Sequence, residues 1–306
     1  MSVFSRPERE AGAFDAVLAA LHAHPFKIHR PHEQRVAFVF ASPHSGRLYP
    51  AGFAAQSRLD ALSLRRSEDA YADALFAGAV ELGAPVIAAR FPRAFLDVNR
   101  APGELDTTMF DGALDVRVDA PNARVNAGLG AIPRIVRDGA EIYRVKLSPQ
   151  EAHERLSRLH APYHAALARL VDETRARFGV AIVIDCHTMP SAASVPDVVL
   201  GDRFGVSAAP MLTRLAEISF ERAGFSVARN TPYAGGYTTQ LYGRRDGYVH
   251  ALQIEINRML YLDEERIEPG ANFASVQVRL NQVLAELIAI DLDALGRVRP
   301  APIAAE

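Results

Sequence analysis

Three short polar segments each follow an apolar run that is typical of a buried β-strand. They are residues 42–46 (Ser-Pro-His-Ser-Gly), 185–189 (Asp-Cys-His-Thr-Met) and 253–258 (Gln-Ile-Glu-Ile-Asn-Arg). In an open α/β sheet, ligands bind outside the carboxyl ends of the strands, so a site is expected where these segments meet. The imidazoles of His44 and His187 are suited to bind a metal ion, and Glu255 supplies a carboxylate.

Each of these segments also has a purely structural interpretation. His44 could simply form a hydrogen bond in a turn. Asp185 and His187 are two residues apart and share one face of a strand, so they could be a buried pair that satisfies itself. If His187 binds a metal ion, however, Asp185 is placed to orient its ring. Glu255 is costly to bury unless it is used, or paired with a buried Arg.

A catalytic metal site needs at least one more ligand. A structural zinc site usually takes four ligands rich in cysteine, and the single cysteine of this chain, Cys186, cannot supply them. A catalytic zinc site often takes two His and one carboxylate and keeps one position open. The acidic candidates are Glu68 and Asp69, at the start of a predicted helix, although acidic residues there also complement the helix dipole. The residues alone leave this choice open.

Two further stretches are suited to bind a substrate. The segment 97–100 (Asp-Val-Asn-Arg) ends another apolar run, and an Arg in that position can hold a carboxylate in a bidentate fork. The segment 234–239 (Ala-Gly-Gly-Tyr-Thr-Thr) precedes the Glu255 strand. Its glycines permit loop closure, and Tyr237 or Thr238 could donate to a substrate. Its alternative interpretation is an ordinary surface turn.

The elements that position these residues are predicted from periodicity. Strands alternate with long helices, which predicts an α/β fold, a three-layer α/β/α sandwich with a mixed or parallel central sheet. Ser67 and Gly83 are expected to begin and end one helix, and residues 148–151 resemble a capping box with Pro149 at the first helical position. The predicted strands are Arg35–Ser42, Pro85–Arg90, Ala94–Val98, Gly179–Cys186 and Val249–Ile256, and the predicted helices are Ser67–Leu82, Ser148–Phe178, Ser207–Ala223 and Phe273–Leu295.

The remaining segment, Ala101–Lys146, is rich in Gly and Pro and has no clear periodicity. We interpret it as a large excursion over the sheet edge rather than a second domain. Residues 1–306 are therefore predicted to form a single catalytic domain.

Composition excludes several classes of protein. The chain has 306 residues, of which 49% are hydrophobic and 23% charged, as expected for a soluble globular protein. The net charge of −2 and the lack of a basic tract exclude a nucleic-acid partner. No apolar stretch approaches the roughly 20 residues that cross a bilayer, and the N-terminus does not resemble a secretory signal. A single cysteine excludes an intrachain disulfide framework and predicts a cytoplasmic location. The oligomeric state is not predicted.

Six segments, taken in order, resemble the N-formylglutamate amidohydrolase family. The resemblance covers roughly residues 35 to 265, and each segment alone is a modest match. The family is associated with histidine catabolism and is related to zinc carboxypeptidases and aspartoacylases, which share a phosphorylase/hydrolase-like α/β/α fold. The segments are residues 42–46, 67–69 (Ser-Glu-Asp), 93–100 (Arg-Ala-Phe-Leu-Asp-Val-Asn-Arg), 185–189, 235–237 (Gly-Gly-Tyr) and 253–258.

The resemblance implies a role for each matched position. His44 and His187 match the two metal-binding histidines. Carboxypeptidase relatives supply the middle ligand as a Glu three residues after the first His, where this chain has Arg47, so the resemblance favours Asp69 as the third ligand. Glu255 resembles the general base. The Asn99–Arg100 pair resembles one that holds a substrate carboxylate.

The implied reaction is hydrolysis of an N-formyl or N-acyl amino acid with Zn²⁺ or another divalent metal. Glu255 would accept a proton from the attacking water, and Arg93 or Tyr237 would stabilise the oxyanion. Arg100 would hold the α-carboxylate of this small-molecule substrate. For a second carboxylate the sequence leaves three candidates, Arg244, Arg245 and Arg258. Two other functions stay open, a carboxypeptidase-like peptide hydrolase and a non-catalytic relative that binds a metal or ligand.

Overall fold

The centre of the fold is a seven-stranded mixed sheet. The computed structural model describes residues 15–136, 139–192 and 194–295. β3, β2, β4 and β7 run parallel to one another, β1 is antiparallel to β3, and the parallel pair of β5 and β6 is antiparallel to β7. The strands, in their order across the sheet, are β1 (Phe26–His29), β3 (Val86–Ala89), β2 (Phe38–Ser42), β4 (Ala181–Met189), β7 (Val249–Asn257), β5 (Val198–Gly201) and β6 (Val227–Arg229).

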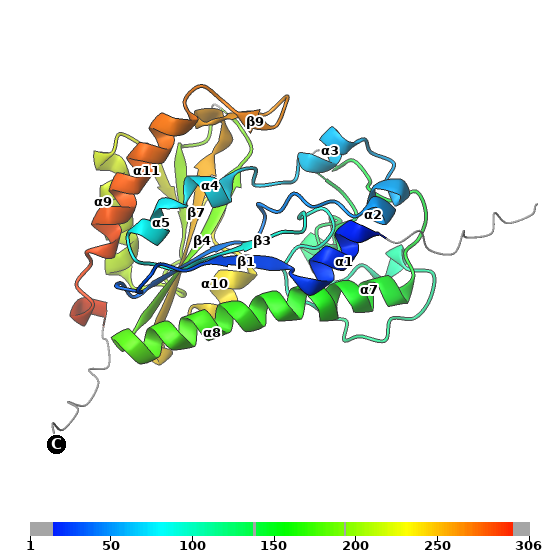
Figure 1. The fold of residues 1–306 in the computed structure, drawn as a ribbon, viewed down its shortest axis with the longest axis horizontal. Coiled ribbons are helices and arrows are strands. Elements are labelled where there is room, and N and C mark those ends of the chain that lie inside the picture. The colour runs from blue at the N-terminus through cyan, green and yellow to red at the C-terminus, as the bar shows by residue number, and fades with distance from the viewer. Residues whose placement is uncertain (1–14, 137–138, 193, 296–306) are drawn as a thin grey trace, which may run out of the picture.

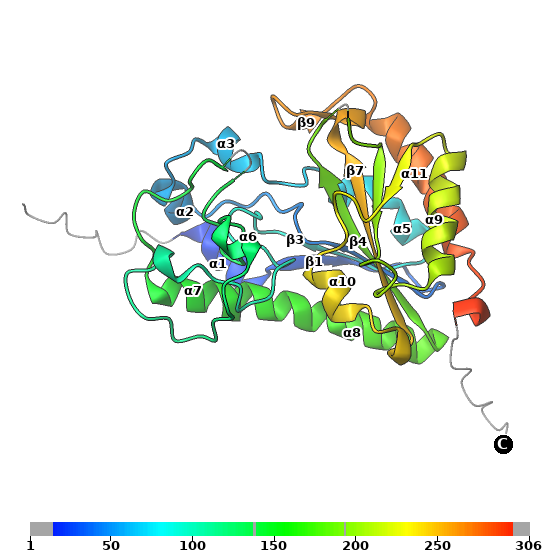
Figure 2. The same ribbon diagram turned by 180° about the vertical axis from the view of Figure 1, so that it is seen from behind.

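Helices cover both faces of this sheet. Figures 1 and 2 show α8 and α10 on one face, and α9 and α11 on the other. The predicted three-layer α/β/α sandwich with a mixed sheet is therefore confirmed. The helices are α1 (Ala16–Ala23), α2 (Ala51–Gln56), α3 (Ala61–Arg65), α4 (Ala72–Leu75), α5 (Gly78–Glu81), α6 (Ala123–Asn126), α7 (Pro149–Arg155), α8 (Ala161–Phe178), α9 (Pro210–Arg222), α10 (Tyr237–Tyr242) and α11 (Phe273–Ile288).

Two hydrophobic cores fill the space between the layers. Along β2 the side chains alternate, so that Val39 and Ala41 pack in the core beneath α8, while Phe38 and Phe40 pack in the core beneath α11. Each fully buried Phe or Leu contributes about 1.5–3 kcal/mol relative to an exposed one. The central strands are therefore held on both faces, which explains why they read as continuous apolar runs.

Two predicted elements are wrong. Residues 94–98 form turns rather than a strand, because Phe95 and Leu96 donate backbone hydrogen bonds to Pro92 and Asp97 donates to Ala131. Their apolar side chains reflect burial, not sheet pairing. The predicted helix Ser67–Leu82 is interrupted, and only the short α4 and α5 form, because Tyr71 adopts φ +63° directly before α4.

The other predicted helices form with shifted boundaries. The capping box at the start of α7 is present, with Ser148 and Glu151 bonded reciprocally and Pro149 in the first turn. A π-helical turn, Leu156–His160, joins α7 to α8. The predicted helix 207–223 begins at Pro210, and the predicted helix 273–295 ends at Ile288 and is followed by a 3₁₀ turn.

The sequence analysis missed three strands of the seven-stranded sheet, β1, β5 and β6. The irregular segment 101–146 contains, in its described part, one 3₁₀ turn (Thr107–Met109) and α6 as its helical elements. Figure 2 shows it beside the sheet, near α2 and α3. A hairpin of β8 (Leu262–Asp263) and β9 (Glu268–Pro269) precedes α11. In the described ranges, each helix is too short or too polar to span a bilayer.

Candidate active site

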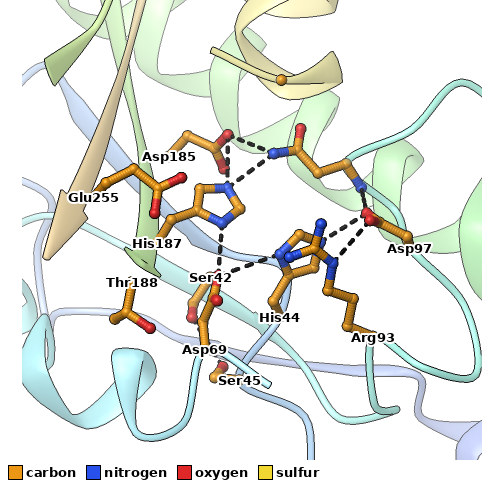
Figure 3. Close-up of polar contacts among 12 residues, drawn as sticks. Ser42, His44, Ser45, Asp69, Arg93, Asp97, Asp185, His187, Thr188 and Glu255 are labelled. Carbon is orange, nitrogen blue, oxygen red and sulfur yellow. Dashed lines mark hydrogen bonds and ion pairs between the residues drawn. The ribbon is translucent and has the colours of Figure 1, made fainter. Parts of the chain in front are cut away.

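The carboxyl ends of β2, β4 and β7 converge on one site (Figure 3). His44 lies two residues beyond β2, and His187 lies near the end of β4. The register pairs His187 with Glu255 and Asp185 with Gln253, so the polar side chains of the two strands lie on one face. That face is the α8 side of the sheet, since Val183 and Ala251 upstream on the same strands pack in the α8 core.

His44, Asp69 and His187 form a buried triad that could hold a metal ion. Asp69 Oδ2 lies 3.2 Å from His44 Nδ1 and 2.8 Å from His187 Nδ1. The backbone brings Asp69 to this position, because its N–H donates to the carbonyl of His44 at 3.0 Å. This tertiary hydrogen bond lies in the stretch where the sequence predicted a continuous helix.

A carboxylate stands behind each imidazole of the triad. His44 Nε2 lies 2.7 Å from Asp97 Oδ1, and His187 Nε2 lies 3.0 Å from Asp185 Oδ2. A carboxylate in this position keeps the imidazole proton on Nε2 and leaves the Nδ1 lone pair for a metal. Burial opposes ionisation of Asp97, but the charges of His44 and Arg93 hold its pKa well below the usual range.

The carboxylates around His187 favour a positive charge at this site. Burial lowers its pKa, but the neighbouring carboxylate of Asp185 outweighs that effect, with help from Asp69, and raises the pKa well above the usual value. A divalent cation and a proton would compete for His187 Nδ1, since a metal ligand must be deprotonated. Two imidazole nitrogens and one carboxylate oxygen match the donor set of a catalytic zinc site.

The structure brings Asp69, and not Glu68, into the triad. Glu68 points elsewhere and accepts hydrogen bonds from Tyr49 and Arg65. The second oxygen of Asp69 is held by Arg258, whose Nη2 donates to Oδ1 at 3.0 Å. One oxygen of Asp69 thus faces the two imidazoles while the other is anchored.

Glu255 has the surroundings expected of a general base. Its Oε1 accepts a hydrogen bond from Gln253 Nε2 at 2.9 Å, and Gln253 is itself oriented because its Oε1 accepts from the Gly236 N–H. Burial raises the pKa of Glu255 to about 7, with Asp69 adding to the rise and His187 and Arg93 opposing it. Among the described residues Glu255 has no ion-pair partner, in contrast to the structural interpretation of a pair with a buried Arg.

Arg93 and Arg100 line the same cavity, which has a volume of about 380 Å³. Arg93 donates from Nε to Asp97 Oδ2 at 3.0 Å, and about a quarter of its side chain is exposed. Arg100 is anchored through Nε to the Leu129 carbonyl and through Nη1 to the Asn99 carbonyl. Arg100 Nη2 has no hydrogen bond within the described part of the chain, so it remains free to bind a ligand.

Asn99 holds Asp185, the carboxylate behind His187, through its side chain. Its Oδ1 accepts from the Thr238 N–H at 2.8 Å, and its Nδ2 donates to Asp185 Oδ2 at 3.2 Å and lies 2.9 Å from His187 Nε2. Both the oxygen and the nitrogen of the Asn99 amide are therefore bonded within the protein, although the sequence predicted that this amide binds substrate. Two histidines hold the backbone on either side of Asn99. His164 Nε2, on α8, lies 2.8 Å from the Val98 carbonyl, and His160 Nε2, at the end of the π-helical turn, lies 2.9 Å from the Arg100 carbonyl.

The structure places Tyr237 and Thr238 outside the residues that line the cavity. Tyr237 packs its ring against His164, with the ring centroids 5.3 Å apart. Tyr233, four residues earlier, lines the cavity instead and lies close enough to Glu255 for that charge to raise its pKa, together with burial. The sequence analysis missed Tyr233, although it directly precedes the segment 234–239 that was singled out for its glycines.

None of the three candidates for a second carboxylate is well placed. Arg258 is buried and uses its guanidinium on Asp69, Thr188 and the Arg66 carbonyl. Arg244 and Arg245 are exposed and do not line the cavity.

Comparison with known proteins identifies the family. The model of the family "N-formylglutamate amidohydrolase" matches residues 36–262. N-formylglutamate deformylases of Pseudomonas aeruginosa and Pseudomonas putida are 31% and 30% identical to this chain; the first alignment covers 87% of this chain and 96% of the relative, and the second covers 84% and 94%.

Solved structures agree with this result. The N-formylglutamate amidohydrolase of Ralstonia eutropha is 34% identical, with a TM-score of 0.81 over 86% of this chain and 98% of that one. A gene product of Agrobacterium tumefaciens, 18% identical, has a TM-score of 0.63 over 88% and 97% of the two chains and shows the same fold. The chain therefore belongs to the N-formylglutamate amidohydrolase family.

Proposed function

We propose that this protein is a metal-dependent amidohydrolase that hydrolyses N-formylglutamate, or a similar N-acyl amino acid, to the free amino acid and formate or another acid. The observation that carries the proposal is the buried triad of His44, Asp69 and His187 beside the carboxylate of Glu255, which forms no ion pair with any described residue. The substrate is taken from the deformylase relatives, which align over most of both chains.

The triad residues fit a Zn²⁺ ion or another divalent cation. Both Nδ1 atoms and one carboxylate oxygen converge, and the carboxylates of Asp97 and Asp185 fix the ring protons on the far side. When bound, such an ion lowers the pKa of a coordinated water and polarises the substrate carbonyl.

The remaining steps fall to the side chains of the cavity. Glu255 accepts the proton of the attacking water and returns it to the leaving amine, for which a pKa near neutrality is suited. Arg93 directs its terminal nitrogens to the oxyanion, and Tyr233 is placed to assist it. Arg100 holds the α-carboxylate and fixes the orientation of the amide. Asn99, Tyr237 and Thr238 act behind these groups as positioning residues.

The segment 101–146 favours a small substrate over a peptide. Residues of this segment, among them Arg124, Leu129, Pro133 and Ile135, supply part of the cavity wall. A polypeptide would need an open cleft at this edge.

We propose that the chain forms one catalytic domain, because both hydrophobic cores pack on the same sheet. The cytoplasmic location stays a prediction.

The test is a substrate panel with purified protein. N-formyl-L-glutamate, N-acetyl-L-glutamate and a short peptide are compared with added Zn²⁺ and after treatment with a chelator, and the free amino acid is measured. The proposal expects hydrolysis of the N-formyl or N-acyl amino acids, loss of activity with the chelator and recovery with metal. Hydrolysis of the peptide alone, or activity that the chelator leaves unchanged, would contradict it.

A further inference from the structure

We propose that Arg124 binds the side-chain carboxylate of the substrate and so makes the enzyme selective for N-acyl derivatives of acidic amino acids. This inference rests on the proposed function. It replaces the three arginines that the sequence suggested for this role with one that the structure places in the cavity.

The arginines that line the cavity differ in how many guanidinium N–H groups have no partner among the described residues. Arg258 is used on Asp69 and Thr188, and Arg93 donates from Nε to Asp97 beside the triad. Arg100 keeps Nη2 free after its bonds to two carbonyls. Arg124 has no side-chain hydrogen bond or ion pair within the described ranges and is exposed at the cavity rim. The whole guanidinium group of Arg124 is therefore available to bind a carboxylate through two parallel hydrogen bonds.

Hydrogen bonds fix Arg124 and Arg100 on the same wall. The Leu129 carbonyl accepts from Arg100 Nε at 3.0 Å, while the Leu129 N–H donates to the Arg124 carbonyl at 2.8 Å. Glu104 ties the two segments a second time, because its Oε1 accepts from the Ala101 N–H and its Oε2 from Asn122 Nδ2. Asn122 in turn caps α6, the helix that carries Arg124.

Positively charged side chains gather on this wall. Burial lowers the pKa of Arg100, and the charges of Arg93 and Arg124 lower it further, against the opposing charges of Asp97 and Glu104. Both carboxylates are engaged elsewhere, since Asp97 binds His44 and Arg93, and Glu104 accepts from the Ala101 N–H and from Asn122. A substrate with two carboxylates would supply a partner for Arg100 and another for Arg124, whereas a substrate with one would supply a partner for Arg100 alone.

The order along the wall assigns each carboxylate. Arg100 follows Asn99, whose Nδ2 is 2.9 Å from His187, so Arg100 lies nearer the triad. The α-carboxylate is attached to the carbon that bears the scissile amide and must also lie near the triad. The side-chain carboxylate lies several bonds farther away and reaches Arg124 at the rim.

Arg66 is the alternative within the cavity. It is also exposed and makes no side-chain bond in the described part of the chain. Its carbonyl, however, accepts from Arg258 Nη1 at 3.3 Å, which places its backbone beside Arg258 rather than beside Arg100. A variant of Arg66 therefore tests the choice between the two walls.

The experiment compares N-formyl-L-glutamate with N-formyl-L-glutamine, whose side chain has the same shape but no charge. For Arg124→Gln we expect kcat/KM to fall about 10- to 100-fold for the glutamate substrate, the range for removing a charged hydrogen-bond partner. The glutamine substrate should change little, so the preference between the two substrates collapses. Arg124→Lys should restore part of the preference, because it restores the charge. Arg117→Gln, an exposed Arg of the same segment that pairs with Asp119, is the matched control.

The possible results separate this inference from the proposed function. If the wild-type enzyme hydrolyses N-formyl-L-glutamate but Arg124→Gln keeps its preference, or if Arg66→Gln alone loses it, the role of Arg124 is wrong and the proposed function stands. If the metal-loaded wild-type protein hydrolyses neither of these substrates and also leaves N-acetyl-L-glutamate intact, the proposed function is overturned and this inference with it. Thermal unfolding of each variant shows whether a loss of activity reflects a loss of folded protein.

Discussion

Replacement of Asp97 by Asn should weaken metal binding without removing a ligand. Asp97 Oδ1 lies 2.7 Å from His44 Nε2 and accepts from the Asn99 N–H at 2.8 Å, while Oδ2 accepts from Arg93. An amide retains the shape of the carboxylate but loses its charge. Its single oxygen can accept either from His44 and the Asn99 N–H or from Arg93, but not from both sides. Removing the partner of a metal-binding imidazole typically lowers metal affinity about 10- to 100-fold. At about 1.4 kcal/mol per tenfold, this is about 1.4 to 2.7 kcal/mol.

The affinity is measured by competition with a chelator of known strength, below the unfolding temperature of the variant. Asp73→Asn is the control, because Asp73 forms a partly exposed ion pair with Arg47 outside the site. Activity of Asp97→Asn should recover in large part at saturating metal, since the ligands themselves remain. Unchanged metal affinity in Asp97→Asn would show that the Asp97–His44 contact does not orient a ligand and would refute this interpretation.

Two further predictions concern the same site. Asp69→Asn should lose metal binding, whereas Glu68→Gln, which removes a carboxylate bonded to Arg65 and Tyr49, should retain it; metal content after dialysis decides between them. Glu255 must be ionised to accept a proton, and burial raises its pKa to about 7. A bound cation favours the ionised form and lowers this pKa. We therefore expect kcat/KM to rise with pH through a midpoint at or below about 7. A kcat/KM that shows no rise with pH anywhere at or below about 7 would contradict the role of Glu255.

The sequence predicted those parts of the site that follow from strand ends. His44, His187 and Glu255 each stand at or beyond an apolar run, and the alternation of side chains places Asp185 with His187 and Gln253 with Glu255. Parallel pairing of β4 and β7 then brings both pairs together. The three-layer fold was predictable for the same reason, since the central strands are buried on both faces and read as continuous apolar runs.

The rest of the site depends on tertiary contacts that no local pattern encodes. Asp69 reaches the triad because the chain leaves the helical path before Tyr71, where local propensity favours a continuous helix. The sequence makes Arg258 and Asn99 candidates for binding substrate, but their side chains bind Asp69 and Asp185. The edge strands β1 and β6 have three or four residues with partly exposed side chains, so they lack the apolar run that marks the buried strands.

The central claim is that Glu255 acts as the general base beside a metal held by His44, Asp69 and His187. Its most direct test is the turnover of Glu255→Gln with the metal content measured on the same sample. We expect the variant to bind metal as the wild type does, while kcat for N-formyl-L-glutamate falls about 10²- to 10⁴-fold. A metal-loaded Glu255→Gln variant that turns over as fast as the wild type would contradict the claim.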